Sequence, residues 1–225
     1  MRTAPDIQSY WDRKIIEWED SIHSKPGTPW IESIAARFRR PVMNRADVAL
    51  ELLARHVANK NVLELGCGSG FFAVRLFRTA RPARITGIDF SPAAIQRAGQ
   101  YAEHERLGNA VSFRVGDVAR TILPEADFTI GLGLLDYLDH EEIRSLFERI
   151  RSPKILFTFS RSDLSPLRLA HIIYLATQKC PKHYYHSEEA LSSLIGSRFG
   201  HLTFVADRRR MSFGGIVHNL ESPSA

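Results

Sequence analysis

The sequence predicts an α/β fold in which a mostly parallel sheet carries helices on both faces. Two observations support this prediction. From residue 61 onward, short apolar segments alternate with longer segments whose apolar residues recur at helical spacing, which is typical of parallel sheets covered on both sides. Directly after the first apolar segment, "NVLELGCGSGFF" over 61–72 places three glycines at alternate positions, as expected where the chain turns sharply beside a ligand.

The elements can be assigned in order along the chain. We expect strands at 61–66, 84–89, 111–117, 127–135 and 154–160, and helices at 44–57, 70–80, 91–107 and 140–150. Ser91 stands directly before Pro92 and is expected to cap the helix that begins there. Residues 201–220 contain two strand-like runs joined by a polar turn, which predicts an antiparallel hairpin at one edge of the sheet.

Two segments fall outside this alternation. Residues 1–43 are polar with interleaved aromatic residues and are broken by Pro26-Gly27 and Pro29, so we expect a helical cap that precedes a main domain over 44–225. Residues 161–186 separate the last parallel strand from the hairpin and are expected to be an insertion that caps the substrate. The apolar centre of this insertion predicts either a cap over a pocket or an interfacial helix in peripheral contact with a membrane.

Composition limits the location and the partners. No apolar run is long enough to span a membrane, and the N-terminus lacks an apolar signal core. Two cysteines cannot build a disulfide framework, so we expect a cytoplasmic protein. The net charge of +5 permits an anionic partner, but the compact basic run is limited to Arg208-Arg209-Arg210. A solvated surface is therefore favoured, and a nucleic-acid partner is not expected.

The glycine segment is expected to bind a cofactor. In a doubly wound sheet, ligands bind at the carboxyl ends of the strands, where Gly66 and Gly68 lie. Asp89 ends the next strand, where an acid typically accepts hydrogen bonds from ribose hydroxyls. A nicotinamide dinucleotide and S-adenosylmethionine both fit these residues. Glu64 favours the second, because its carboxylate would repel a pyrophosphate and attract an ammonium or sulfonium group.

Four segments together resemble the class I S-adenosylmethionine-dependent methyltransferases. "VLELGCGSG" is similar to the first signature of that family, "ITGIDFS" to the second, "RVGDV" to the third and "ADFTIGLGLLDYL" to the fourth, in the same order and spacing over 61–138. The resemblance implies a Rossmann-like sheet of seven strands with a reversed edge strand. It also implies S-adenosylmethionine as cofactor and methyl transfer as the reaction.

Carried over by position, the resemblance implies a set of cofactor-binding residues. Glu64 would lie beside the amino group of the cofactor, Asp89 would bind its ribose and Asp117 its adenine. The implied set is Glu64, Gly66, Cys67, Gly68, Asp89, Phe90, Ser91, Gly116, Asp117, Val118, Leu132 and Gly133. Plainer interpretations exist: Asp89 with Ser91 could belong to a helix cap, Asp117 could be a turn residue, and Cys67 could be a packing residue.

Two segments offer a general base, which helps when an acceptor atom must lose a proton. Asp136 and Tyr137 follow the fourth strand, and His183 and His186 lie in "HYYH". The alternatives are that Tyr137 packs against the sheet edge and that the histidines are satisfied within a packed loop. Zinc binding by Cys180 with the two histidines is disfavoured, because a fourth ligand at the usual spacing is missing.

The absence of two known motifs limits the classes of molecule that we expect to accept the methyl group. "GLGLLD" stands where methyltransferases of base amino groups carry Asn/Asp-Pro-Pro-aromatic, and "SRSD" lacks the Asp-Asn of the metal-dependent catechol type, so we expect no metal. The favoured hypothesis is methyl transfer to an oxygen atom of a small-molecule acceptor, because His, Tyr and Asp candidates are present and the base-amino motif is absent. The insertion is similar to those of small-molecule methyltransferases, including quinone and porphyrin enzymes, and would suit a large or apolar acceptor. The alternatives are N- or C-methylation, methylation of RNA or protein, a cofactor-binding module without activity, and a dehydrogenase.

Overall fold

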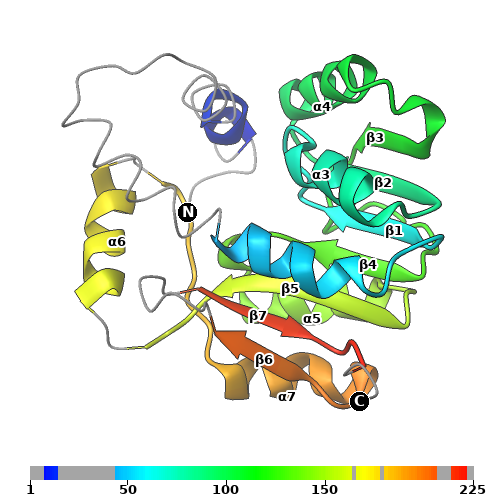
Figure 1. Ribbon diagram of the computed structural model, residues 1–225. Coiled ribbons are helices and arrows are strands. Elements are labelled where there is room, and N and C mark those ends of the chain that lie inside the picture. Colours follow the sequence, from blue (N-terminus) through cyan, green and yellow to red (C-terminus); the bar gives the residue numbers. More distant parts are fainter. Residues whose placement is uncertain (1–7, 15–43, 164–165, 178–179, 207–213, 222–225) are drawn as a thin grey trace.

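A seven-stranded sheet forms the centre of the molecule (Figure 1). The computed structural model describes residues 8–14, 44–163, 166–177, 180–206 and 214–221. Along the sheet the strands follow the order β3-β2-β1-β4-β5-β7-β6. Their bounds are β1 (Asn61–Leu65), β2 (Arg84–Asp89), β3 (Val111–Val115), β4 (Phe128–Gly131), β5 (Lys154–Ser160), β6 (Thr203–Ala206) and β7 (Gly214–His218).

The predicted mixed sheet is confirmed. The first five strands pair in parallel, and β7 pairs antiparallel with β5 on one side and with β6 on the other. The reversed strand β7 therefore lies one position inside the edge, which is occupied by β6, its partner in the predicted hairpin. The strand order reverses between β1 and β4, where loops that leave in opposite directions open a crevice in such sheets.

Helices cover both faces of the sheet. The helical residues 44–54 and α3 (Phe71–Ala80) lie on one face, with α4 (Pro92–His104) beside α3 against β2 and β3. On the other face lie α5 (His140–Arg149) and α7 (Glu188–Phe199), whereas α6 (Pro166–Thr177) stands beside the end of the sheet (Figure 1). Two buried cores result, one containing Leu53 and Leu76 and the other Phe147 and Leu191. No helix among the described residues is long and apolar enough to cross a membrane.

Local sequence fixes the helix starts that border the site. Ser91 Oγ accepts a hydrogen bond from the backbone N–H of Ala94, with Pro92 in the first helical position of α4. Asp139 caps α5 and exchanges hydrogen bonds with Glu142 in a capping box. These caps set where the loops after β2 and β4 end and the helices begin.

The predicted strand over 127–135 is four residues long in the structure. It ends at Gly131, and Leu135–Tyr137 form the short helix η2. Gly131 is needed for close packing, because a Cβ there would lie 2.6 Å from the ring of Phe157 on β5. The chain then turns at Gly133, whose φ of 76° ends the extended conformation.

We expect Gly131→Ala to lower the free energy of unfolding by about 1–3 kcal/mol, because the buried ring of Phe157 has to move. Gly99→Ala is the matched control, since Gly99 lies within α4 and has no heavy atom within 4 Å of its Cβ position. This control should leave stability unchanged or raise it by up to about 1 kcal/mol. Urea denaturation measures both, and equal effects would contradict the packing interpretation.

Candidate functional site

The glycine-rich turn after β1 leaves open space at the carboxyl edge of the sheet. Gly66 and Gly68 have φ values of 68° and 52°, in the left-handed region that favours glycine. No heavy atom beyond the chain neighbours lies within 4 Å of a Cβ placed at Gly68, and the same holds for Gly133 after the neighbouring strand β4. Two adjacent loops thus lack side chains where a ligand would approach the backbone.

Asp89 holds the glycine turn in place. The Asp89 carboxylate accepts hydrogen bonds from the backbone N–H groups of Gly68 and Ser91, both at 2.9 Å. The side chain is buried, and this burial raises the pKa of Asp89, although the backbone hydrogen bonds oppose the rise. Each carboxylate oxygen keeps a further lone pair. Asp89 therefore serves the structural role near the Ser91 cap and can still accept from ligand hydroxyls.

Glu64 is buried at the same edge with an unsatisfied oxygen. The residue is 2% exposed, and its Oε2 atom has no hydrogen-bond partner among the described residues. Burial, followed by repulsion from Asp89, raises the pKa of Glu64 to about 8. A buried carboxyl that lacks a partner is costly unless a ligand supplies one. The ammonium group of S-adenosylmethionine fits this requirement, whereas a phosphate does not.

The helical residues 8–14 lie over the loop after β2. Gln8 Nε2 donates to the backbone carbonyl of Phe90 at 3.5 Å, and Ser91 Oγ hydrogen-bonds to the Asp12 carboxylate. Residues 8–14 thus contact the loop that carries two of the implied cofactor residues. Residues 15–43, which hold most of the predicted N-terminal cap, lie outside the described part of the chain.

The loop after β3 is shaped by Asp117. Asp117 Oδ1 accepts from the backbone N–H of Ala119 at 2.9 Å, and its side chain is about half exposed. Gly116 approaches the side chain of Thr121, and Val118 packs against the second core. These contacts correspond to the turn interpretation of Asp117, whose Oδ2 atom also lies 3.8 Å from Arg120 Nε in an exposed ion pair.

Cys67 and Leu132 flank the two glycine turns. The Cys67 thiol is buried against the Cβ position of Gly87, and burial raises its pKa well above the usual value. Such a thiol is not a nucleophile at neutral pH, so Cys67 acts as a packing residue beside the turn. Leu132 packs partly buried against the first core, directly before Gly133.

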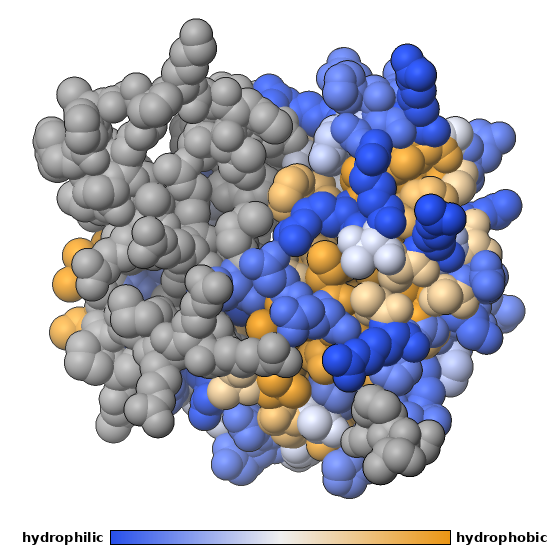
Figure 2. Space-filling view, in the orientation of Figure 1, coloured by the Kyte–Doolittle hydropathy of each residue, from blue (hydrophilic) through white to orange (hydrophobic). Residues whose placement is uncertain are grey.

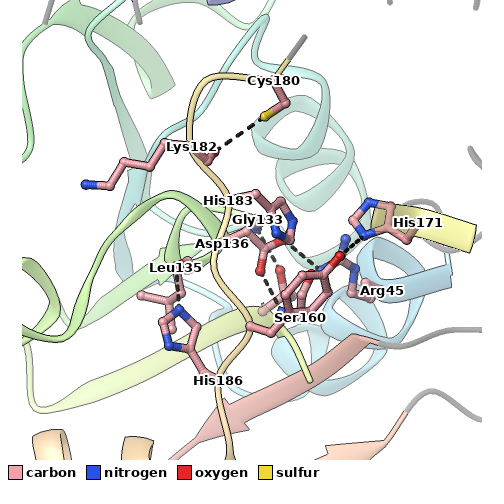
Figure 3. A network of polar contacts seen from close by, with 12 residues as sticks. Arg45, Gly133, Leu135, Asp136, Ser160, His171, Cys180, Lys182, His183 and His186 are labelled. Atoms are coloured by element: carbon pink, nitrogen blue, oxygen red, sulfur yellow. Dashed lines mark hydrogen bonds and ion pairs between the residues drawn. The ribbon is translucent and has the colours of Figure 1, made fainter. Parts of the chain in front are cut away.

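Asp136 contacts three other parts of the chain (Figure 3). It is 3% exposed, and its carboxylate accepts from Arg45 Nη1 at 3.2 Å and from the backbone N–H of Ser160 at 2.6 Å. Its own carbonyl accepts from the backbone N–H of Tyr184 at 2.7 Å. His183 Nε2 lies 4.0 Å from the carboxylate. Asp136 therefore connects the helical residues 44–54, the end of β5 and the loop before α7.

Sequence reasoning missed Arg45, although a signal was present. Arg45 lies four and eight residues before the buried Ala49 and Leu53, so helical spacing places it on the buried face. A charged side chain on such a face requires a buried partner. The aliphatic part of the Arg45 side chain packs against Gly214 at the start of β7, where a Cβ atom would collide with it.

Five ring side chains near Asp136 contact one another in what we call the aromatic wall: Trp11, Tyr137, His171, His183 and Tyr185. Tyr137 contacts Trp11 and His183 edge to face, with ring centroids 4.7 and 5.7 Å apart. The His183 ring lies 5.0 Å from that of His171 and 4.8 Å from that of Tyr185, and Tyr185 hydrogen-bonds to His171 Nδ1 at 2.8 Å. The wall thus combines residues 8–14, η2, α6 and the loop before α7.

Burial keeps the members of the aromatic wall uncharged. It lowers the pKa of His171 to about 4, with help from His183, and it also lowers the pKa of His183. It raises the pKa of Tyr185 to about 12 and the pKa of Tyr137 well above its usual value. At neutral pH the two histidines are therefore neutral and the two tyrosines protonated.

His186 lies apart from this wall. Its Nε2 atom hydrogen-bonds to the carbonyl of Leu135 at 2.8 Å, and its backbone N–H donates to the carbonyl of Ser160 at 2.8 Å. The residue is 1% exposed. Figure 3 shows His186 on the opposite side of Asp136 from His171. These contacts make His186 an anchor of the loop, although its Nδ1 atom has no hydrogen-bond partner among the described residues.

Among the described residues, no group of three or more His, Cys, Asp or Glu side chains is arranged to hold a metal ion. Cys180, considered above as a zinc ligand, has its thiol directed to the carbonyl of Lys182 at 3.4 Å.

The insertion exposes an apolar surface on α6. Leu169, Ile172 and Ile173 are 61%, 43% and 58% exposed, and Figure 2 shows apolar atoms at the outer edge of the molecule where Figure 1 places α6. The same helix carries His171 and Arg168, and the guanidinium of Arg168 lies 4.7 Å from the centre of the Tyr185 ring. The helix thus contributes to the aromatic wall and also presents an apolar surface.

Comparison with known proteins identifies a related family and several similar folds. The family model described as "Methyltransferase domain" matches residues 56–188. The O-antigen chain terminator bifunctional methyltransferase/kinase of Escherichia coli is 36% identical over 98 residues, 40% of this chain and 13% of that protein. The magnesium-protoporphyrin O-methyltransferase of Rhodobacter capsulatus is 30% identical over 146 residues, 56% of this chain and 64% of that protein. The match thus spans less than two thirds of either curated relative.

Solved structures with the same fold include methyltransferases crystallised with their cofactor. The magnesium protoporphyrin IX methyltransferase of Synechocystis PCC 6803 with bound S-adenosylhomocysteine has a TM-score of 0.72 at 18% identity, covering 96% of this chain and 98% of that one. Human N-acetylserotonin methyltransferase in complex with S-adenosylmethionine has a TM-score of 0.60 at 22% identity, covering 78% and 50%.

We expect S-adenosylmethionine binding to release a proton from Glu64. In the free protein the Glu64 carboxyl, with its pKa at about 8, is mostly protonated at pH 7, whereas pairing with the ligand's ammonium requires the carboxylate. Affinity should therefore rise with pH up to about 8 and fall at higher pH, where the ammonium of the free ligand, an α-amino group with a pKa of about 8, loses its proton. Calorimetry at pH 7 in buffers of different protonation enthalpy should show about one more proton released by the natural protein than by Glu64→Gln.

The variant Glu64→Gln also distinguishes the effect of Glu64 on ligand affinity from its effect on folding stability. Glu64→Gln should weaken S-adenosylmethionine binding about tenfold or more, since a charge-assisted bond is lost. In the ligand-free protein it should raise the unfolding free energy at pH 7, because the raised pKa makes Glu64 increasingly destabilising from about pH 4.5 to about pH 8. Equal affinity and equal proton release in both proteins would contradict this role of Glu64.

We expect Asp136→Ala to lower the unfolding free energy by about 3–5 kcal/mol, because it leaves Arg45 buried without its carboxylate. Asp47→Ala is the matched control: Asp47 lies in the same helix as Arg45 and pairs with Arg75 at the surface. The control should cost less than about 1 kcal/mol. Urea denaturation compares the two variants, and similar losses would show that Asp136 has no special place in the fold.

Proposed function

Because this chain belongs to the methyltransferase-domain family of class I S-adenosylmethionine-dependent methyltransferases, we propose that it methylates a small molecule at oxygen without a metal. The cofactor, S-adenosylmethionine, supplies a methyl group activated by a positively charged sulfur. The observation that carries the acceptor proposal is the aromatic wall at the carboxyl edge of the sheet, where uncharged rings offer a surface for an apolar or ring-shaped molecule.

The cofactor is expected to occupy the turns after β1, β2, β3 and β4. Glu64 supplies a buried carboxyl for the ammonium group, Gly66 and Gly68 supply the open turn, and Asp89 supplies a carboxylate for the ribose. The adenine would then lie near Phe90 and Asp117. The remaining members of the set line the same loops: Cys67, Ser91, Gly116, Val118, Leu132 and Gly133.

The covering segments support a small acceptor. Residues 8–14 contact both the cofactor loop, through Ser91, and the aromatic wall, through Tyr137. We interpret residues 1–43 and the insertion over 161–186 as covers that align the acceptor and exclude water, which is most of what methyl transfer requires of a protein. A covered site of this kind suits a small molecule better than an RNA or a protein chain.

The names of several relatives agree with this class of acceptor. The matched proteins include the magnesium-protoporphyrin O-methyltransferase noted above, a demethylmenaquinone methyltransferase of Deinococcus radiodurans and a norajmaline N-methyltransferase of Rauvolfia serpentina. We infer a cytoplasmic site of reaction from the cysteines Cys67 and Cys180, neither of which forms a disulfide.

The reaction should be detectable with deuteromethyl S-adenosylmethionine. Incubation with a panel of small hydroxy, carboxy, amino and carbon-acid compounds is expected to yield products three mass units heavier than the ordinary methylated compound, with the label on oxygen by NMR. EDTA should leave the rate unchanged, since we propose no metal. Asp89→Ala, which removes the carboxylate that holds Gly68, should reduce turnover at least tenfold, whereas the surface variant Asp47→Ala should not.

Labelling confined to RNA or protein would overturn the small-molecule proposal. Labelling of small molecules at nitrogen or carbon would retain the acceptor class and reject oxygen. Loss of activity in EDTA that is restored by a divalent metal would reject metal-independent transfer.

A further inference from the structure

We propose that His183 is the general base of this reaction, that Asp136 positions its ring, and that the acceptor group is the hydroxyl of an aromatic ring. The inference rests on the proposed function and assigns the roles within that site.

His183 has one ring nitrogen toward an acid and the other without a partner. Its side chain is 8% exposed, Nε2 lies 4.0 Å from the Asp136 carboxylate, and Nδ1 has no hydrogen-bond partner among the described residues. A neutral histidine beside a carboxylate carries its proton on the nitrogen that faces the acid. The Nδ1 atom then has the lone pair, and it is buried in the aromatic wall where a ligand hydroxyl can supply the missing partner. The 4.0 Å separation is of the kind that shortens when a substrate completes a site.

Asp136 is suited to positioning rather than to proton transfer. One carboxylate oxygen accepts from the backbone of Ser160 at 2.6 Å and the other from Arg45 at 3.2 Å. Both oxygens are buried within these contacts, so an acceptor has no open approach to them. The remaining direction leads to His183. Asp136 therefore fixes the ring and stabilises the imidazolium that forms when His183 takes a proton.

The other titratable groups around His183 are unsuited to act as the base. His171, from α6, has its Nδ1 atom engaged by Tyr185 at 2.8 Å. Tyr137, from η2, and Tyr185 hold their protons at neutral pH, because burial raises the pKa of each. His186 also has an Nδ1 atom without a hydrogen-bond partner among the described residues, but its Nε2 atom lies on the Leu135 carbonyl and its ring faces His140 and Tyr184 rather than the aromatic wall. His183 is thus the neutral histidine whose unpartnered nitrogen lies among the rings of the wall.

The charges around the wall favour a hydroxyl over a carboxylate as acceptor. A carboxylate is already ionised at neutral pH and needs a cation rather than a base. The described cations nearby are engaged: Arg45 with Asp136, Arg168 with the Tyr185 ring and the carbonyl of Ser162. Lys182 pairs with Glu142. A hydroxyl on an aromatic ring, with a pKa of about 10 like that of tyrosine, needs a base and no cation, and its ring can stack or pack edge to face against the wall.

The chemical step is balanced with these groups alone. As the acceptor oxygen forms its bond to the donated methyl carbon, its proton moves to Nδ1 of His183 and the carbon–sulfur bond breaks with its electron pair left on sulfur. The products are a methyl ether, neutral S-adenosylhomocysteine and a His183 imidazolium, which later loses its proton to solvent.

A matched pair of probes tests the acceptor. 2-Naphthol and 2-naphthoate share one ring system and differ in the acceptor group. Formation of S-adenosylhomocysteine should show at least a tenfold higher kcat/KM for the naphthol. An equal or higher value for the naphthoate, or no turnover of either at millimolar concentration, would overturn the assignment of an aromatic hydroxyl.

The variant His183→Asn tests the base. With 2-naphthol at pH 7 it should lower kcat/KM about a hundredfold and leave S-adenosylmethionine affinity unchanged. Much of the loss should be recovered above about pH 10, where the probe ionises without help. His104→Asn, at an exposed histidine on α4, should behave like the natural protein. A loss that is the same at every pH would assign His183 a structural role and overturn its role as base.

A spectroscopic readout does not depend on turnover. In ¹⁵N-histidine-labelled protein with S-adenosylhomocysteine, the signal removed by His183→Asn should report a neutral ring protonated on Nε2 at pH 7. A protonated ring, or a proton on Nδ1, would overturn the proposal. Transfer to naphthoate but not to naphthol would overturn this inference and leave small-molecule O-methylation standing. Transfer to no small molecule at all would instead reject the proposed function.

Discussion

The buried carboxylate of Asp136 is the contact on which the proposed acceptor side of this molecule depends. It follows β4, yet its partners come from the helical residues 44–54, from the end of β5 and from the loop before α7. An isolated charge at that depth would be strongly destabilising, so each partner has to be present for the others to be tolerated. The loop that carries His183 and Tyr185 is thereby fixed to the sheet, and α6 is in turn held to that loop by the contact between His171 and Tyr185.

At the proposed cofactor side, in contrast, one buried carboxyl group lacks a partner. Asp89 is satisfied by two backbone N–H groups, whereas Glu64 is left buried with an oxygen that lacks a partner in the described structure. Burial near a second acid makes the ionised form of Glu64 unfavourable until a cation arrives. The protein thus keeps a locally destabilised group at the site proposed for the positively charged donor, and local rules of stability are often broken in this way at functional sites.

The two sides meet through residues 8–14. This short helix contacts Ser91 at the start of α4 and Tyr137 in η2, so the same segment borders both the predicted cofactor loop and the aromatic wall. Methyl transfer needs donor and acceptor aligned in a site from which water is excluded. In the proposed function, this segment would therefore help to align the two halves of the site.

The sequence by itself determined the features that depend on local patterns. Alternating apolar segments predicted the parallel strands, glycine spacing predicted the turn after β1, and Ser91-Pro92 predicted the start of α4, because backbone preferences and side-chain periodicity act within a few residues. The tertiary structure alone decided which distant side chains meet. Arg45 pairs with Asp136, which lies 91 residues further along the chain. Trp11 contacts Tyr137, although the strands β1 to β4 separate the two residues in the sequence. Strand order decides which loops become neighbours at the carboxyl edge, and His183 and His186, three residues apart in one loop, consequently face different surroundings. Burial and neighbouring contacts then decide which ring suits the proposed role of base and which ring anchors the loop, and a linear pattern does not contain that information.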